Sequence, residues 1–439
     1  MTKTIEKTKT GYKKTELGWI PEDWEFINIF ESSTLKARIG WQGLTTAEYK
    51  ETGDYYLITG TDFINGKIKW DTCHYVEKNR YDQDKNIQLK LNDILITKDG
   101  TIGKIAFIDN LPKEATLNSG VFVVRPKEKS YLPYYLIHIL NSNYFSIFLY
   151  KLKTGSTISH LYQKDFVNFK FPIPLKLAEQ QKIAEILTCW NKAIEKTENL
   201  IEAKTQLKKG LMQKLLTGKV RFKEFVKEEG FKKTKIGLVP KDWEIKKLHE
   251  IAKRVTRKND GNKYEILTIS SLAGFLNQSD RFNKVIAGNS LDNYTFLFKN
   301  EFAYNKGNSK TYPYGCIFRL EDYEKALIPN VYISFGMFNV STDYYKHCFI
   351  KGMLERQLKR IISSGARNDG LLNVAPAEFF KCLVIYPPII EEQQKIAAVL
   401  TTCDKEIELL NKQLDTLKEE KKSLMQKLLT GQVRVKVEN

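Results

Sequence analysis

Two long stretches of the chain place mostly apolar side chains four and three residues apart in alternation. They cover about 178–217 and the equivalent positions near the C-terminus. This spacing is typical of a heptad stripe on one side of a long helix. We therefore predict two helices of about 40 residues, each about 60 Å long. The stripe positions are Ile183, Leu187, Trp190, Ile194, Thr197, Ile201, Lys204, Lys208, Leu211 and Leu215, and then Ile396, Leu400, Cys403, Ile407, Leu410, Leu414, Leu417, Lys421, Leu424 and Leu428.

The ends of both predicted helices carry the expected signals. Glu179 and Glu392 fall in the first turn, where the helix dipole favours an acidic side chain. Gly218 and Gly431 follow the last apolar residue, where a left-handed cap favours glycine. These signals fix where each helix begins and ends.

The two stretches are also copies of one another. EQQKIAEIL at 179–187 returns as EQQKIAAVL at 392–400, and KKGLMQKLLTG at 208–218 returns as KKSLMQKLLTG at 421–431. TELGWIPEDWE at 15–25 similarly resembles a later TKIGLVPKDWE. The chain is therefore a tandem duplication with nearly identical ends and diverged centres, and such repeats fix the architecture.

An exposed apolar stripe is unstable by itself, so each helix needs a partner. The direction of the chain makes the other helix the obvious partner, in an antiparallel pair with a pseudo-two-fold axis. The alternative is that each helix only fills a core. Near-identity outside the stripe favours a surface that one partner binds twice. We predict its contacts at Gln180, Gln181, Gln213, Lys214, Gln393, Gln394, Gln426 and Lys427.

The diverged centres contain short alternating runs rich in β-branched and aromatic residues. DYYLITGTDF, NDILITKDG, KIAFID and GVFVVRP are typical of strands separated by turns. Residues 131–152 predict an aromatic-rich helix, with a counterpart within 336–362. We expect an α+β fold with two globular domains joined by two long antiparallel helices. The predicted segments are a 1–17 arm, domain 18–175, helix 176–222, linker 223–236, domain 237–388 and helix 389–435.

Loops inside the centres have a composition suited to DNA. They are 96–107 with its counterpart 303–315, and 153–166 with its counterpart 363–379. Glycine lets a backbone approach phosphate, basic and hydroxyl groups position a duplex, and Arg or Asn can read base edges. Such a loop can also be only a connection. The candidate DNA contacts are Lys98, Thr101, Lys104, Ser156, Thr157, His160, Lys306, Asn308, Ser309, Lys310, Arg367 and Asn368.

The composition of the chain limits which partners and cellular locations we expect for the protein. The net charge of +18 and pI near 9.3 fit a polyanionic partner, although a lysine-rich genome composition would also raise both values. No apolar run reaches about 18 residues, so we expect no membrane span. The polar, charged N-terminus does not resemble a signal peptide. The six cysteines form no C-x-x-C pair, which indicates reduced thiols in the cytoplasm and no metal site.

The sequence provides no catalytic constellation. G-T-I-G-K at 100–104 lacks the spacing of a phosphate-binding loop. E-I-K at 244–246 resembles a nuclease fragment but has no acidic partner upstream, so an amphipathic strand is favoured. The five histidines are scattered. We therefore predict that this chain has no catalytic residue and no cofactor of its own.

Several motifs together resemble one family. They are G-[WL]-[IV]-P-x-D-W-E, G-S-T-I-S-H-L at 155–161, F-P-I-P-L-x-L-A-E-Q-Q-K-I-A at 171–184 and L-M-Q-K-L-L-T-G. They look like the specificity subunit of type I restriction–modification systems. This resemblance implies two target recognition domains, each reading half of a bipartite DNA site, with the helices setting the gap. The second repeat departs from the family pattern, because it has G-A-R-N-D-G-L at 365–371.

The resemblance also implies the partners and their cofactors. Two methyltransferase subunits would carry S-adenosylmethionine and methylate adenine, and restriction subunits would use ATP and Mg²⁺. A modification-only assembly is an alternative within the same class. A two-domain DNA-binding regulator without a methyltransferase is an alternative of a different class. The missing motifs argue against a stand-alone nuclease or methyltransferase.

Overall fold

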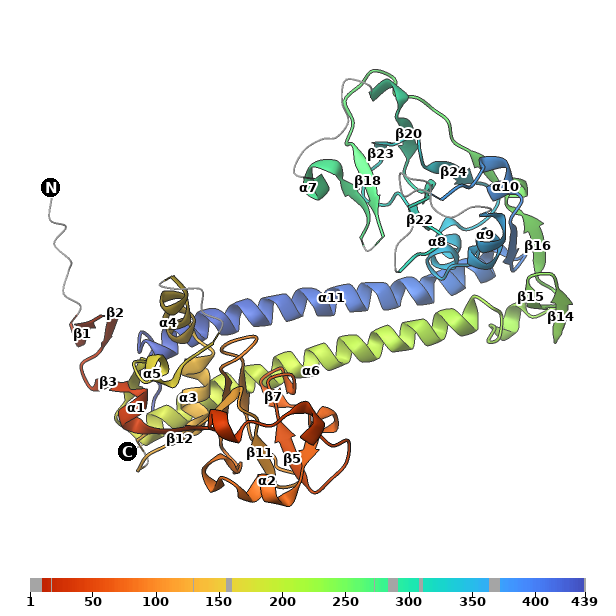
Figure 1. Ribbon diagram of the computed structural model, residues 1–439. Coiled ribbons are helices and arrows are strands. Elements are labelled where there is room, and N and C mark those ends of the chain that lie inside the picture. The colour runs from red at the N-terminus through yellow and green to blue at the C-terminus, as the bar shows by residue number, and fades with distance from the viewer. Residues whose placement is uncertain are drawn as a thin grey trace. The chain divides into compact units, whose positions relative to one another are not determined.

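The structure is a computed structural model of the 439-residue chain. It describes residues 10–16, 18–128, 130–154, 160–271, 273–282, 291–307, 311–362 and 372–437. Figure 1 draws the chain and labels its helices and strands. Among the described residues, no helix is both long and apolar enough to cross a membrane.

The chain divides into two units: the first is built from two separate segments and the second from one continuous segment. The first unit contains 1–198 and 412–439, and the second contains 199–411. Each unit therefore takes one half of each long helix. The sequence-based division differed, because it set both helices apart from the domains as segments 176–222 and 389–435.

The first unit holds two main sheets. The four-stranded sheet has the order β10 (Ile105–Phe107), β9 (Ile94–Thr97), β12 (Val121–Pro126) and β4 (Ser33–Ala37). The three-stranded sheet has the order β11 (Ala115–Leu117), β5 (Tyr55–Ile58) and β8 (His74–Val76). Two-stranded pairs are β1 (Tyr12–Thr15) with β2 (Gly18–Pro21), β3 (Trp24–Asn28) with β13 (Lys170–Pro174), and β6 (Phe63–Ile64) with β7 (Lys67–Ile68).

The helices of the first unit pack on its two sheets. They are α1 (Ile29–Ser32), α2 (Lys78–Asp82), α3 (Pro133–Leu140), α4 (Asn143–Thr154), α5 (Gln163–Phe166), the first half of α6 (Leu177–Leu215) and the last part of α11 (Ile390–Leu429). One buried cluster joins sheet residues such as Ile96 to Ile139 of α3, Leu187 of α6 and Leu428 of α11. A second cluster fills the space between the two sheets.

The helix expected over 131–152 is present in two pieces. The break lies at Asn141 and Ser142, between α3 and α4. The Ser142 hydroxyl donates to the carbonyl oxygen of Ile139 at 2.6 Å and accepts from Tyr144 N–H at 3.2 Å. A serine that bonds its own backbone in this way favours a helix start over a helix interior, and this explains the break.

The second unit repeats the main sheet of the first. Its order is β22 (Cys316–Arg319), β21 (Phe302–Asn305), β24 (Ile333–Met337) and β17 (Ala252–Arg254). The pairs are β14 (Phe231–Thr234) with β15 (Gly237–Pro240), β16 (Glu244–Lys247) with β25 (Leu383–Tyr386), β18 (Leu267–Ser270) with β19 (Gly274–Asn277), and β20 (Thr295–Phe298) with β23 (Lys325–Ile328). Its helices are α7 (Gln278–Phe282), α8 (Thr342–Ile350), α9 (Glu355–Ile361), α10 (Pro376–Phe380), the second half of α6 and the first part of α11.

The core of the second unit, like that of the first, is formed by the main sheet, a short helix and both long helices. Phe335 of the sheet, Tyr345 of α8, Leu215 of α6 and Leu400 of α11 belong to one buried cluster. The α+β prediction is confirmed in both units. The diverged centres therefore share one architecture although their sequences do not align.

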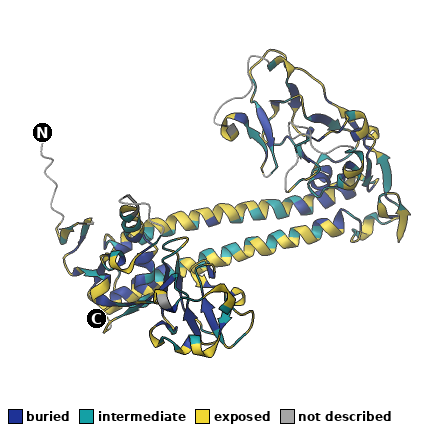
Figure 2. Ribbon diagram, in the orientation of Figure 1, coloured by how far each residue is buried: buried dark blue, intermediate teal, exposed yellow. Residues whose placement is uncertain are grey.

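The long helices run antiparallel within each unit. In the first unit, Lys418 Nζ of α11 lies 2.8 Å from Glu198 Oε1 of α6. In the second unit, Lys204 Nζ lies 2.8 Å from Glu406 Oε2, and Lys208 pairs with Asp404. Ascending numbers in one helix face descending numbers in the other, as predicted. Figure 2 shows that the middle of each helix is exposed except along a partly buried stripe.

Candidate nucleic-acid interface

The predicted DNA loops of the first unit lie at one end of its main sheet. β12 is antiparallel to both β9 and β4, and Val121 is opposite Thr97 while Phe122 is opposite Ala37. The loops after β4, after β9 and before β12 therefore leave the same end of the sheet. The loop after β5 joins them, because Asn118 N–H donates to the carbonyl oxygen of Ile58 at 2.9 Å. We call this end the reading edge.

The two loops predicted to bind DNA meet at this edge. Leu161 N–H donates to the carbonyl oxygen of Lys98 at 2.7 Å. The imidazole of His160 pairs with the carboxylate of Asp99 beside this bond. The second unit has the same connection, since Leu372 N–H donates to the carbonyl oxygen of Lys306 at 2.9 Å. In both units a loop after a central strand is thus tied to a segment just before a late helix.

The loop from 98 to 104 is held in a defined shape. Thr97 Oγ1 donates to the carbonyl oxygen of Thr101 at 2.5 Å and accepts from Lys104 N–H at 2.9 Å. Gly103 has φ +81°, and a Cβ there would lie 2.5 Å from Leu149 Cδ1. Thr101 and Lys104 are consequently presented to solvent by a rigid turn. Exposed hydroxyl and ammonium groups are of the kind that can bind phosphate oxygens.

The other described candidates differ in their exposure. The ammonium of Lys98 lies 5.3 Å from the ring centre of Phe122, and burial lowers its pKa. His160 and Lys306 are half-buried. Seven predicted contacts lie outside the described residues, namely Ser156, Thr157, Asn308, Ser309, Lys310, Arg367 and Asn368.

Sequence reasoning missed three loops of the reading edge. The loop after β4, the loop 59–62 and the loop 118–120 all reach this end. Asn118 Nδ2 donates to the hydroxyl oxygen of Tyr49 at 2.6 Å, which joins two of them. Alternation of apolar residues predicts strands but not their order, so no sequence signal could bring these loops together.

The predicted partner surface divides into exposed and buried positions. Gln181, Gln213, Lys214, Gln394, Gln426 and Lys427 are exposed. Gln180 and Gln393 are only 1% exposed. Gln180 Oε1 accepts from Leu132 N–H at 2.9 Å, and its Nε2 donates to the carbonyl oxygen of Pro174 at 2.9 Å.

Gln393 makes the equivalent bonds to Ser341 N–H at 2.9 Å and to the carbonyl oxygen of Pro387 at 2.8 Å. Both amides therefore connect the start of a long helix to its own domain. We therefore correct the prediction that Gln180 and Gln393 contact a partner. The two glutamines occur at equivalent positions of both repeats because each forms buried hydrogen bonds inside its own unit, where a buried amide must have its hydrogen bonds satisfied.

Two arginine clusters, one in each unit, explain the near-identical ends. Arg221 Nε lies 2.8 Å from Glu392 Oε1, and its Nη1 lies 2.5 Å from Asp242 Oδ1. The repeat continues past LLTG as G-x-V-R, and this signal was present in the sequence. Each arginine joins the end of one long helix to the start of the other and to the P-x-D-W-E segment.

The first unit has the matching cluster around Arg434. Arg434 Nε lies 2.7 Å from Glu179 Oε1, and its Nη2 lies 2.8 Å from Asp23 Oδ2. The hydrogen bond from Arg434 lowers the pKa of Asp23. The two ends of the chain are therefore connected within one unit.

The terminal glycines complete this junction. Gly218 has φ +67° and Gly431 has φ +66°, so both adopt the predicted left-handed cap. A Cβ on Gly431 would lie 2.3 Å from Pro21 Cγ, and one on Gly218 would lie 2.3 Å from Pro240 Cγ. The opening and closing motifs of the repeat are thus two sides of one contact.

His138, His347 and Glu244 lie outside these clusters and have hydrogen-bond partners within the fold. His138 and His347 are buried, and their Nε2 atoms lie 3.2 Å from Thr188 Oγ1 and 3.1 Å from Thr401 Oγ1. Burial lowers the pKa of each imidazole to about 4. Glu244 accepts from the Tyr386 hydroxyl at 2.9 Å and lies in β16, as the amphipathic-strand interpretation expects. No cluster of three or more His, Cys, Asp or Glu side chains suited to a metal occurs in the described part of the chain.

Two units share the same main sheet, and in each a loop after a central strand is tied to a segment just before a late helix, so the protein repeats one scaffold twice. The comparisons with known proteins agree. Residues 21–204 match the model of the type I restriction modification DNA specificity domain. The putative type I restriction enzyme MjaX specificity subunit of Methanocaldococcus jannaschii is 27% identical, with 97% of each chain covered. The MjaVIII specificity subunit of the same organism is also 27% identical, covering 95% of this chain and 94% of the relative.

Solved structures show the same fold. The S subunit of a type I restriction–modification system from M. genitalium superimposes with a TM-score of 0.56 at 16% identity, over 92% of this chain and 96% of that one. Residues 21–204 thus match a type I specificity domain, and the chain is similar over nearly its whole length to type I restriction enzyme specificity subunits. Since these relatives are specificity subunits, the comparisons support the prediction that this chain is not itself the enzyme.

Proposed function

We propose that this chain binds a bipartite, asymmetric DNA site, with each unit contacting one half through its reading edge. The observation that carries the proposal is the pairing of the two predicted loops in both units, by Leu161 with Lys98 and by Leu372 with Lys306. Repeated scaffolds with unlike loops suit two unlike half-sites. In the first unit the exposed Thr101 and Lys104 would position the duplex, because hydroxyl and ammonium groups bind phosphate oxygens.

The same proposal extends to the partners. The exposed pairs Gln213–Lys214 and Gln426–Lys427 are identical in the two repeats. Identical surfaces suit two copies of one partner, which for a type I system is the methyltransferase subunit. Restriction subunits would join the same assembly. S-adenosylmethionine, ATP and Mg²⁺ would then belong to these partners and not to this chain.

Selection from random duplex DNA tests the proposal. The purified full-length chain is used with and without its methyltransferase subunit, and the retained duplexes are sequenced. We expect two unlike short motifs at a fixed gap, enriched mainly when the partner is present. A single contiguous motif, or full enrichment by the chain alone, would instead support a two-domain regulator.

A further inference from the structure

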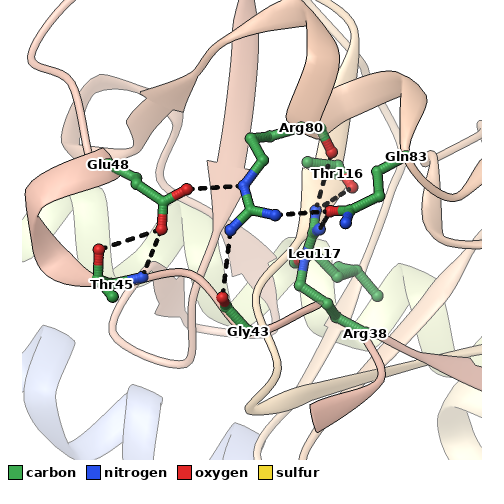
Figure 3. A network of polar contacts seen from close by, with 8 residues as sticks. All are labelled: Arg38, Gly43, Thr45, Glu48, Arg80, Gln83, Thr116 and Leu117. Atoms are coloured by element: carbon green, nitrogen blue, oxygen red, sulfur yellow. Dashed lines mark hydrogen bonds and ion pairs between the residues drawn. The ribbon is translucent and has the colours of Figure 1, made fainter. Parts of the chain in front are cut away.

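A network of two arginines, the buried Arg38 and the half-buried Arg80, holds a loop of the first unit that no motif singled out. The loop follows β4, runs through 38–49 and contains the short helices η1 (Gly40–Gln42) and η2 (Thr46–Glu48). Arg38 at its base is 1% exposed. Figure 3 shows the guanidinium groups of Arg38 and Arg80 side by side, both directed at the side chain of Gln83.

Arg38 forms its hydrogen bonds only with neutral oxygens in this network. Nε donates to the carbonyl oxygen of Leu117 at 2.8 Å, and Nη2 donates to Thr116 Oγ1 at 3.2 Å and to the carbonyl oxygen of Arg80 at 3.3 Å. Nη1 donates to Gln83 Oε1 at 3.1 Å. A buried cation without a bonded carboxylate is costly. The fork geometry of arginine nevertheless ties the strand end, β11 and α2 together at one point.

Arg80 carries the connection on to the loop itself. Its Nη2 donates to the carbonyl oxygen of Gly43 at 3.3 Å, and its Nε donates to Glu48 Oε1 at 2.7 Å. The hydrogen bond from Arg80 lowers the pKa of Glu48 to about 2. Glu48 is the only acidic residue between 38 and 49. The loop therefore presents the hydroxyl groups of Thr45 and Thr46 and the apolar side chain of Ile39, while its one carboxylate is already bonded to a cation.

Both ends of the loop 38–49 lie at the reading edge. It leaves the reading edge at Ala37, and its far end returns there through the bond between Tyr49 and Asn118. Thr46, the first residue of η2, is exposed. Duplex DNA lying on the reading edge would bring its phosphates to this loop, and phosphate attracts hydroxyl and cationic groups while it repels free carboxylates.

We propose that the loop 38–49 contacts the DNA backbone beside the first half-site, with Arg38 as the positioning residue that holds it there. This inference rests on the proposed DNA-binding function and adds an element to it. The contact positions the duplex and does not read bases. The loop acts in the first unit alone, since its sequence belongs to one diverged centre.

Substitutions of Thr46 test the contact. The probe is the duplex that the wild-type chain and its methyltransferase subunit recover from the random pool. We expect Thr46→Asp to weaken binding of that duplex at least tenfold, because an exposed carboxylate on this loop repels phosphate. Thr46→Lys should bind at least as tightly as wild type, with a steeper dependence on salt.

The matched control is Thr52→Asp. Thr52 is also exposed, in the same unit, but it precedes the start of β5 whereas the reading edge follows the end of that strand. We expect this variant to bind within twofold of wild type. Binding of Thr46→Asp within twofold of wild type, or an equal loss in Thr52→Asp, would overturn the inference.

A double-mutant cycle tests the positioning role of Arg38. Arg38→Lys keeps the charge but cannot make the forked bonds, so we expect weaker DNA binding. Its effect should be smaller when Thr46→Asp is already present, because both act through one loop. Additive effects would assign Arg38 to general stability. If Arg38→Lys does not fold, the Thr46 series still decides.

The two proposals fail in different ways. If the wild-type complex recovers no duplex with two motifs, the proposed function fails and the loop inference fails with it. If the wild-type complex recovers such a duplex and Thr46→Asp binds it normally, only the loop inference fails.

Discussion

Arg221 and Arg434 occupy equivalent positions in the two repeats, and each bonds two carboxylates that are distant in sequence. Each is the meeting point of a helix end, a helix start and a P-x-D-W-E segment. Arg434 and Asp23 are 411 positions apart. Their environments differ, because the side chain of Arg221 is 8% exposed and that of Arg434 is 41% exposed. This difference gives a comparison within one chain.

We expect Arg221→Ala to destabilise the second unit more than Arg434→Ala destabilises the first. Removing one partner of a buried pair leaves an uncompensated charge and costs about 3–5 kcal/mol. Glu392 is fully buried beside Arg221. The two sites differ in the second carboxylate, since Asp242 is 9% exposed and Asp23 is 58% exposed. Arg434→Ala would therefore leave only Glu179 buried and should cost about 1–2 kcal/mol less. Calorimetry of the two variants measures both losses, and equal losses would contradict the role of burial.

The buried histidines predict a loss of stability in mild acid. The pKa of His138 and of His347 falls from 6.5 to about 4 on folding. Below pH 6.5 the unfolded chain therefore binds more protons than the folded chain, and stability falls as the pH drops toward 4. At about 1.4 kcal/mol per pKa unit, each histidine contributes at most about 3 kcal/mol.

Melting temperature measured between pH 7 and pH 4 checks this expectation. A double variant with His138→Gln and His347→Gln keeps a polar group near each threonine but cannot titrate. We expect its melting temperature to fall less steeply over that range. A slope equal to that of wild type would show that other groups cause the acid sensitivity.

At the scale of elements, the glycines that follow the two long helices allow each helix end to pack closely against a proline of the P-x-D-W-E segment. Gly218 and Gly431 combine a positive φ with a proline that leaves no room for a Cβ. This is the physical reason that the L-L-T-G motif is kept in both repeats. An exposed glycine elsewhere in the same helix has no such constraint.

Gly431→Ala and Gly218→Ala should each destabilise the chain by about 1–3 kcal/mol, through strain and overpacking. Gly210→Ala is the matched control. Gly210 lies inside α6 with no atom within 4 Å of its Cβ position, and the second repeat has Ser423 there. We expect it to stabilise by about 0.5–1 kcal/mol through helix propensity. Urea unfolding measures all three, and a loss in Gly210→Ala would contradict this account.

At the scale of the whole molecule, the chain repeats its scaffold and varies its loops. Both units order their main sheet in the same way, although their centres do not align. The long helices supply a defined length of chain between the centres. If that length sets the gap of the DNA site, changing it should change the gap.

We expect four residues added to each long helix to lengthen the gap. The added residues extend each helix by about 6 Å, on the order of one to two base pairs. The insertion belongs between 198 and 204 in α6 and between 406 and 418 in α11, because these segments carry the facing pairs. Insertion in α6 alone leaves α11 shorter and serves as the comparison. Methylation mapping of the variant complex gives the gap. An unchanged gap would contradict the idea that the length of the helices sets it.

The candidate site could be predicted from the sequence only in part. Glycine, lysine and hydroxyl residues mark 96–107 as a loop suited to phosphate, because that chemistry is local. The loop 38–49 carries no comparable signal, since it reaches the reading edge only through the strand pairing of Ala37 with Phe122. Burial of Gln180 and Gln393 was missed for a similar reason, because identical residues in a repeat serve the interior as well as the surface.

The sequence by itself determined the duplication, the two long helices with their caps, and the α+β class of the centres. These follow from spacing and from residue type, which act over a few neighbouring positions. Only the tertiary structure decided which loops share the reading edge and which carboxylates Arg221 and Arg434 bind. Those contacts depend on strand order and on pairs hundreds of residues apart, and local patterns carry no information about either.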